Sequence, residues 1–356
     1  MEYVNLGDVA TYINGYAFKP EQRGKKGLPI IRIQDLNGNS YDLGFFDGEY
    51  PKQVEINAGD ILISWSGSLG VYKWNKGKAL LNQHIFKVLF NKIKIDKEYF
   101  CYAIRNSLAA MSQQTHGATM KHITKKDFDN ILIPYPNLNV QKQIANNLEI
   151  VNELIESYKK ELILLEQLIK ARFVEMFGEP VNNPKKFEKR SLKDTCKIVT
   201  GNTPSRAVEE YYGDFVEWIK TDNIISGEIN PTRAVEYLSE EGMKVGRVVE
   251  EDAILMACIA GSIASIGRVC VTDRTVAFNQ QINAIVPYDY NQLFLYVLLQ
   301  ISKDYLIEDV SMALKGILSK SKLEEKEFIV PPIELQNQFA DFVRQVDKSR
   351  FIFGFK

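Results

Sequence analysis

Basic side chains interleaved with aromatic side chains gather in two stretches of the first 137 residues. One stretch holds Lys19, Arg23, Lys25 and Lys26, and residues 65–78 mix three lysines with two tryptophans. Lysine and arginine bind backbone phosphates, whereas aromatic and small polar side chains contact bases. Taken singly, each basic residue could equally be a solvated loop residue, and one of the tryptophans could equally belong to the hydrophobic core. As a group they predict a nucleic-acid surface, with these candidates: Lys19, Arg23, Lys25, Lys26, Trp65, Ser66, Lys73, Trp74, Lys76, His116 and Lys121.

A second group of candidates lies after residue 200. Its members are Asn202, Thr203, Arg206, Lys220, Arg268, Lys315 and Lys320. Residues 181–332 carry 18 basic and 22 acidic side chains, against 17 and 13 in residues 1–137. Because DNA is held mainly through its phosphates, an acidic segment binds it weakly on its own. We therefore expect this half of the chain to need a partner that holds the DNA backbone.

The sequence lacks the motifs that most often mark a catalytic site. It contains no G-x-x-x-x-G-K-[ST] phosphate loop, no G-x-G-x-x-G and no G-x-S-x-G. Its Pro331-Pro332 pair lacks the amide and the ring with which an amino-methyltransferase holds the target amine. The three histidines and four cysteines show no metal-ligand spacing. We expect neither a catalytic residue nor a metal ligand in this chain.

The composition also excludes several classes of protein. The longest apolar run, around residues 253–260, is shorter than the ~20 residues that span a bilayer. The first fifteen residues lack the basic head and apolar core of a signal peptide. The scattered Cys101, Cys196, Cys258 and Cys270 fit reduced, mostly buried thiols. We expect a cytoplasmic protein with no membrane segment.

An internal repeat organises the chain. Five motifs of the first half recur in the same order in the second half, which indicates a duplication. The matches are residues 6–15 with 192–201, 31–36 with 219–224, 61–68 with 254–262, 82–83 with 279–280, and 134–141 with 331–336. Each repeat is predicted to be a globular unit followed by a helix. In the first unit we expect strands near 30–33, 60–64 and 85–90 and a helix over 99–111.

The repeated amide pairs, Asn82-Gln83 and Asn279-Gln280, have two interpretations. Asparagine and glutamine can read adenine with two hydrogen bonds. Their presence in both halves instead favours a shared structural role, because residues that read different sequences should differ. The loops that do not match between the halves are the better places for specificity: 16–28, 65–78, 112–122, 202–214 and 311–322.

The clearest single element is a helix over residues 141–177. Its apolar residues alternate at spacings of four and three, which is a heptad seam, and Gly178 and Pro180 end it. At ~1.5 Å per residue this helix is about 55 Å long, so part of the seam needs a partner beyond its own domain. A second helix from Leu335 is about half as long, and antiparallel pairing would leave about half of the first seam uncovered. The predicted subunit interface comprises Ile144, Leu148, Val151, Ile155, Tyr158, Leu162, Leu165, Ile169, Phe339, Val343 and Val346.

This arrangement resembles the specificity subunits of type I restriction–modification systems. Each unit has an Ile-Leu…Gly-Ser strand, an Asn-Gln pair and a proline-rich strand that leads through Leu/Ile-x-x-Gln into a long helix. The resemblance covers essentially the whole chain. It implies two target recognition domains that each read half of a split DNA site, and helices that form a spacer and dock two adenine-methyltransferase subunits. It also implies that S-adenosylmethionine, ATP and Mg belong to the methyltransferase (M) and motor-nuclease, or restriction (R), subunits, with no cofactor in this chain.

We therefore predict an α+β fold with two repeated globular target recognition domains separated by long coiled-coil-like helices. The predicted segments are domain 1 at 1–137, a spacer helix at 138–180, domain 2 at 181–332, and a shorter helix at 333–356, where the family's two helices are usually comparable. The predicted function is a non-catalytic DNA-specificity subunit. The alternatives are a stand-alone DNA methyltransferase or nuclease with divergent motifs, and a helical adaptor that binds no DNA. We also expect self-association through the exposed seam.

Overall fold

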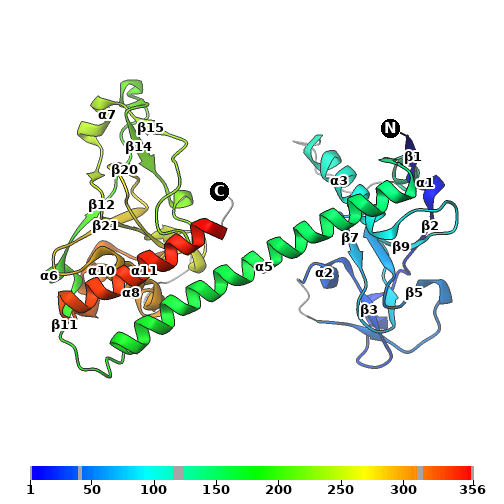
Figure 1. Ribbon diagram of the computed structural model, residues 1–356, viewed down its shortest axis with the longest axis horizontal. Coiled ribbons are helices and arrows are strands. Elements are labelled where there is room, and N and C mark those ends of the chain that lie inside the picture. The colour runs from blue at the N-terminus through cyan, green and yellow to red at the C-terminus, as the bar shows by residue number, and fades with distance from the viewer. Residues whose placement is uncertain (1, 39–41, 115–123, 309, 311–315, 354–356) are drawn as a thin grey trace. The chain divides into compact units, whose positions relative to one another are not determined.

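The computed structural model describes residues 2–38, 42–114, 124–308, 310 and 316–353. The chain divides into two compact units, residues 1–155 and 156–356. Each unit combines helices with small sheets, as the predicted α+β class requires (Figure 1). Within the described ranges, no helix is both long and apolar enough to cross a membrane.

The first unit is built on two four-stranded sheets. One has the antiparallel order β2-β9-β6-β7, and the other has the order β4-β3-β8-β5 with β3 and β8 parallel. Helix α3 packs beside β7 and buries Phe100 and Ile104. The elements are β1 (Tyr3–Asn5), α1 (Leu6–Val9), β2 (Thr11–Asn14), η1 (Pro20–Gln22), β3 (Leu28–Ile31), α2 (Ile33–Leu36), β4 (Phe45–Phe46), η2 (Lys52–Val54), β5 (Glu55–Ile56), β6 (Ile61–Ser64), β7 (Gly70–Lys73), β8 (Ala79–Leu81), β9 (Ile85–Leu89), α3 (Lys97–Gln114), α4 (Lys125–Asp129) and β10 (Leu132–Pro134).

The second unit repeats this plan. Its sheets have the orders β12-β21-β17-β19 and β13-β15-β14-β20-β16, and β14 and β20 are the parallel pair. The almost wholly buried helix α8 packs against β19 and against α11. The elements are β11 (Lys189–Ser191), α6 (Leu192–Thr195), β12 (Cys196–Thr200), η3 (Glu209–Tyr211), β13 (Tyr212–Gly213), β14 (Val216–Ile219), η4 (Thr221–Asn223), β15 (Tyr237–Leu238), α7 (Glu240–Val245), β16 (Val248–Val249), β17 (Ile254–Ala257), β18 (Ile259–Ala260), η5 (Ile263–Ser265), β19 (Val269–Val271), β20 (Val276–Phe278), β21 (Ile282–Pro287), α8 (Gln292–Ile301), α9 (Lys303–Ile307), β22 (Gly316–Ile317), α10 (Lys320–Glu325) and β23 (Glu327–Ile329).

The predicted repeat is confirmed at the level of single hydrogen bonds. The amide of Gly15 donates to Ile85 at 3.0 Å, and that of Gly201 donates to Ile282 at 3.0 Å. The side chain of Gln141 accepts from the Asp96 amide at 2.9 Å and donates to the Pro136 carbonyl at 2.8 Å. Gln336 makes the same two contacts with Asn291 and Pro331, at 2.9 and 2.8 Å. The Leu/Ile-x-x-Gln motif therefore locks the start of each helix to its own globular unit.

The predicted elements of the first unit are present with small shifts at their ends. The strands expected near 60–64 and 85–90 are β6 and β9, and the helix expected over 99–111 is part of α3. The strand expected at 30–33 ends earlier, at Ile31. Ile33 instead begins α2, where the Asp35 carboxylate accepts from the backbone amide of Arg32 at 2.7 Å and turns the chain into the helix.

The two long helices are α5 (Leu138–Phe177) and α11 (Ile333–Phe353). The side chain of Asn137 caps α5 by accepting from the Val140 amide at 3.1 Å, and Gly178 ends it with a φ of +76°. In the second unit α11 runs antiparallel to the last turns of α5 (Figure 1). Phe339 packs against Phe173 with ring centroids 5.4 Å apart. As the sequence predicts, the shorter α11 covers only part of α5.

Candidate functional site

Several predicted contacts of the second unit gather around one buried tryptophan. The guanidinium of Arg206 lies 4.3 Å from the ring centroid of Tyr212 and 5.1 Å from that of Trp218. The Lys220 ammonium lies 5.0 Å from the Trp218 ring. Both cations pair with the carboxylate of Glu236. We call these five residues the Trp218 cluster: Arg206, Tyr212, Trp218, Lys220 and Glu236.

The Trp218 cluster is charged and reaches the protein surface. Trp218 is 3% exposed, whereas the side chains of Arg206 and Glu236 are 55% and 34% exposed. Hydrogen bonds from Lys220 and Arg206 lower the pKa of Glu236, so its carboxylate is ionised at neutral pH. Arginine and lysine suit guanine edges, and a carboxylate suits the amino group of cytosine. The cluster thus offers donors and an acceptor side by side at an accessible surface.

Asn202 and Thr203 border the Trp218 cluster and serve as its scaffold. The Asn202 side chain donates to the Val245 carbonyl at 2.9 Å and accepts from the Arg247 amide at 2.8 Å. The Thr203 hydroxyl donates to the side chain of Gln280. The structure therefore brings Asn202, Thr203, Arg206 and Lys220 together, although both hydrogen-bonding groups of Asn202 are occupied within the protein.

The predicted basic loop of the first unit, residues 19–26, is mostly accessible. Lys19, Lys25 and Lys26 are exposed, and none of them forms an ion pair with another described residue. Arg23 is half-buried, and its side chain lies against Gly44. Unpaired, solvated lysines are suited to phosphate contact because no internal carboxylate must be displaced first.

Residues 65–76 divide between core and surface. Trp74 is 7% exposed and its indole N–H donates to the Gly77 carbonyl at 2.8 Å, while Ser66 is 9% exposed. Both are buried, so we remove them from the proposed DNA surface. Trp65 is half-buried, donates to the Asn14 side chain at 3.2 Å and stacks on Phe86. Of the two exposed lysines, Lys73 pairs with Glu98, and Lys76 lies 5.9 Å from the Trp74 ring.

The remaining candidates belong neither to the basic loop nor to the Trp218 cluster. Arg268 donates from Nη2 to the carbonyl of Thr221, next to Lys220, at 3.3 Å. Lys320 pairs with Glu324 on the short helix α10. His116, Lys121 and Lys315 lie outside the described residues. The basic loop and the Trp218 cluster are therefore the candidate recognition surfaces of their respective units.

The repeated amide pairs lie at a turn where two backbone segments of the same unit come close together. The backbone amide of Asn82 donates to Ile31 and that of Asn279 donates to Ile219, both at 3.0 Å. Asn279 is 5% exposed, and its side chain accepts from the Gln281 amide at 3.1 Å. Asn82 is 9% exposed. This geometry supports the structural interpretation of the asparagines.

The predicted interface seam on α5 is covered at its C-terminal end and open in its middle. Ile169 lies in a core cluster with Phe339, Val343 and Val346 of α11, and Leu165 packs at its edge. Ile144 packs against the core of the first unit, and Tyr158 is half-buried. Leu148, Val151, Ile155 and Leu162 are exposed, by 36–49% of their surface.

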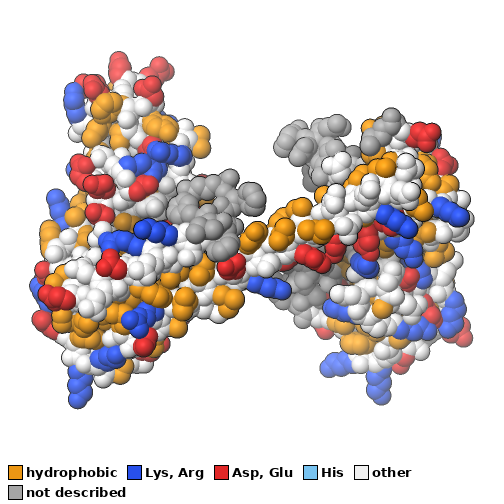
Figure 2. Space-filling model, viewed as in Figure 1, with side chains coloured by type: hydrophobic (Ala, Val, Ile, Leu, Met, Phe, Trp, Pro, Cys, Tyr) orange, Lys and Arg blue, Asp and Glu red, His pale blue; other side chains and the backbone are white. Residues whose placement is uncertain are grey.

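The open stretch of α5 is broader than the predicted seam. We call the exposed heptad residues Leu148, Val151, Ile155 and Leu162 the α5 apolar face (Figure 2). Further exposed apolar residues lie on other sides of the helix: Ile150, Leu154, Ile163, Leu164 and Leu168. Ile150, Leu154, Leu164 and Leu168 lie outside the heptad and were missed by the sequence analysis. The four-residue spacing from Ile150 to Leu154 and from Leu164 to Leu168 is the sequence pattern that could have identified them. Glu236, the acidic member of the Trp218 cluster, was also missed. Gln280, which accepts from the Thr203 hydroxyl, was noted in the sequence only as part of a repeated amide pair.

Among the described residues, the cysteines and the potential metal ligands are the candidates for further chemistry. The four cysteines are buried free thiols, and burial raises the pKa of Cys101 to about 11 and that of Cys196 to about 12. In the parts of the chain that the structure describes, no three potential ligands form a metal-binding group. The described chain consists of a duplicated scaffold. The two units carry different charged surfaces, and helix α5 carries exposed apolar residues.

Together, the duplicated α+β units, the charged faces and the apolar helix define a class of modular recognition and assembly proteins. The profile of the type I restriction modification DNA specificity domain matches residues 1–167 and 184–352. The chain therefore belongs to the family of specificity subunits of type I restriction–modification systems. Specificity subunits are the non-catalytic DNA-recognition components of these systems.

Individual relatives span nearly the whole chain. The chain is 24% identical to the type I restriction enzyme EcoBI specificity subunit of Escherichia coli, covering 96% of this chain and 78% of the relative. It is 25% identical to the MjaVIII specificity subunit of Methanocaldococcus jannaschii, covering 97% and 86%. The crystal structure of the type I system S subunit from M. genitalium superposes with a TM-score of 0.60 at 15% identity, covering 99% and 90%.

Proposed function

We propose that the two units read the two halves of a bipartite DNA site. The observation that carries this proposal is a shared scaffold with different faces. The hydrogen bonds of Gly15, Asn82 and Gln141 recur in the second unit, yet the exposed charges differ between the described parts of the units. Lys220 pairs with Glu236 beside Trp218, whereas Arg32 at the matching position of the first unit pairs with Asp35. Identical scaffolds with different exposed side chains are suited to reading two different base sequences.

The α5 apolar face is the proposed docking surface for the methyltransferase subunits. An exposed apolar stripe of this extent is unfavourable in water, and such stripes mark interaction surfaces. A docked subunit would also supply phosphate contacts that the acidic second unit lacks. The motor-nuclease subunits join this assembly, and S-adenosylmethionine, ATP and Mg act in those partners. The assembly acts in the cytoplasm. In the absence of partners, a second copy of this chain covers the same face.

A mobility-shift experiment tests this function. The chain is mixed with a random-sequence duplex, alone and with its methyltransferase subunit, and S-adenosylmethionine binding by the chain is measured separately. We expect weak, salt-sensitive binding alone and a strong shift with the partner. No shift under either condition would favour the adaptor alternative, and S-adenosylmethionine binding by the chain alone would favour the enzyme alternative.

A further inference from the structure

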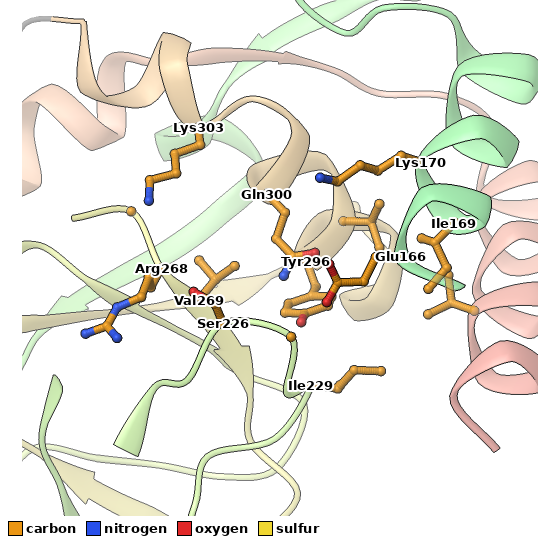
Figure 3. Close-up of a pocket in the computed structure, with 14 residues that line it drawn as sticks. Glu166, Ile169, Lys170, Ser226, Ile229, Arg268, Val269, Tyr296, Gln300 and Lys303 are labelled. Atoms are coloured by element: carbon orange, nitrogen blue, oxygen red, sulfur yellow. The ribbon is translucent and has the colours of Figure 1, made fainter. Parts of the chain in front are cut away.

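A cavity of about 370 Å³ lies in the second unit, beside the C-terminal half of α5. Figure 3 shows that its wall is formed by α5, by α8 and the start of α9, and by the loops around Ser226 and Arg268. Lys170 comes from α5, Lys303 from α9 and Arg268 from the loop before β19. Glu166 is the one carboxylate among the residues that line it, so these side chains carry a net charge of +2.

The two deeper cations are fixed by backbone carbonyls. Arg268 donates from Nε to the Ser265 carbonyl and from Nη2 to the Thr221 carbonyl, both at 3.3 Å. The Lys303 ammonium donates to the Ala264 carbonyl at 2.5 Å. Both side chains are half-buried, and neither forms an ion pair with any described residue. Their orientation is therefore set by the fold, while their charges are not neutralised.

This situation is unusual for the buried and half-buried cations of this unit. Arg190 pairs with Asp289, Arg274 with Glu217 and Lys326 with Glu308. At the cavity, by contrast, desolvation and the neighbouring Arg268 charge lower the pKa of Lys303. Two like charges held together against their repulsion form a site that an external anion would stabilise.

We infer that this cavity binds a phosphate group through Lys303 and Lys170, with Arg268 contributing its positive charge from the edge of the cavity. Lys170 is exposed on α5 and its ammonium points toward the cavity in Figure 3, as does the amide of Gln300. Glu166 lies on the opposite side of the cavity from Lys303 and contacts Gly227, where a Cβ would lie 2.9 Å from Oε1. The phosphate is either free inorganic phosphate or a phosphodiester of bound DNA, and only the second source rests on the proposed function.

The first test measures phosphate binding without DNA. The thermal midpoint of the full chain is followed in sodium phosphate and in sodium chloride of equal ionic strength, for the wild type and the Arg268→Gln/Lys303→Gln double variant. Lys197→Gln removes an exposed charge on β12, outside the cavity, and is the matched control. We expect a saturable rise with phosphate for the wild type and control, and no rise for the double variant.

Lys170→Gln provides a second variant, because an exposed lysine can change without affecting folding. It should raise the phosphate concentration at half-saturation several-fold. A wild-type midpoint that does not distinguish phosphate from chloride would overturn the inference. So would a phosphate effect in the double variant and in Lys170→Gln that equals the effect in the wild type.

The second test identifies the source of the phosphate. The affinity of the chain with its methyltransferase for duplex DNA is measured against salt concentration. If a DNA phosphodiester occupies the cavity, the double variant lowers the slope of log K against log salt by about 0.9. An unchanged slope, together with a positive first test, assigns the site to free phosphate. If the wild-type complex binds no DNA, the proposed function is contradicted, but the result of the phosphate test remains valid.

Discussion

Glu236 is the residue that joins Arg206 and Lys220 into one cluster. The two basic residues were candidates because of their residue type, and Arg206 also because of its loop, but the acidic partner was not predicted. Glu236 precedes β15, and the antiparallel pairing of β14 with β15 places it beside Trp218, whose amide donates to the Glu236 carbonyl at 3.0 Å. That register depends on strand pairing across twenty residues, which no local sequence pattern reveals.

Glu236→Gln should change base recognition and leave stability nearly unaltered. Exposed ion pairs contribute about 0–1 kcal/mol to stability. A well-placed contact with a base contributes about 1–3 kcal/mol to discrimination. We expect a ~5- to 150-fold loss of discrimination at one G·C pair of the second half-site, measured by binding to duplexes substituted at each position.

The exposed Glu241, which pairs with Lys244 on α7, gives a matched control. Glu241→Gln should leave both stability and recognition unchanged. A uniform loss of affinity for every duplex in Glu236→Gln would indicate a general electrostatic role and not a base-reading one.

Glu217 carries a prediction about acid stability. Burial opposes its ionisation, but hydrogen bonds from Arg274, the Ala234 amide and Arg233 outweigh burial and lower its pKa to about 2. A folded pKa below the unfolded value means that the pair stabilises the fold above about pH 4.5 and that this stabilisation is lost as the pH falls toward 2. After allowance for solvent screening, the loss should be roughly 1–2 kcal/mol.

Calorimetric unfolding at several pH values tests this prediction. Glu217→Gln should be destabilised at pH 7 and should lose less of its remaining stability than the wild type between pH 4.5 and 2. An identical pH dependence in the wild type and the variant would show that Glu217 is not the titrating group.

Among the elements, α5 was the easiest to predict from the sequence. The length of α11 determines which apolar residues of α5 remain exposed. The heptad spacing, the cap at Asn137 and the stop at Gly178 are local signals, so the helix ends could be predicted within three residues. Which apolar residues stay exposed could not, because that depends on where α11 ends. The result is that Phe173 and Phe177 are fully buried, whereas Leu164 is 61% exposed.

Leu162→Asp should abolish assembly with the methyltransferase without unfolding the chain. In the free chain the new carboxylate remains hydrated, because Leu162 is 36% exposed. On docking it would be buried without a partner, which costs several kcal/mol, or more than 100-fold in affinity. Ile155→Asp should behave alike, and size-exclusion chromatography with light scattering measures both.

Lys160→Asp places the same carboxylate on the side of the same helix opposite to Leu162, away from the α5 apolar face, and is the control. It should assemble normally. Normal assembly of Leu162→Asp and Ile155→Asp would remove the α5 apolar face from the interface.

At the scale of the whole molecule, the duplication explains how much of the fold the sequence could predict. A Cβ at Gly15 would lie 2.0 Å from the Asn82 carbonyl oxygen, and one at Gly201 would lie 2.1 Å from that of Asn279. No other residue fits such a close approach, so these glycines persist in both units and mark the repeat. The candidate recognition faces carry no such constraint, which is why the sequence indicated residue types there but not which of them, such as Ser66 and Trp74, are buried.

The central claim, that the units read half-sites independently, is tested most directly by the methylated motif of a host that expresses the complete complex. Residues 202–214, which include Arg206 and Tyr212, are replaced by a loop of equal length from a relative, and residues 19–26, the basic loop of the first unit, are replaced in a second variant. We predict that the first replacement changes only one half of the methylated motif and that the second changes only the other half. A replacement that alters both halves, or replacements that alter neither in an active complex, would contradict independent reading by the two units.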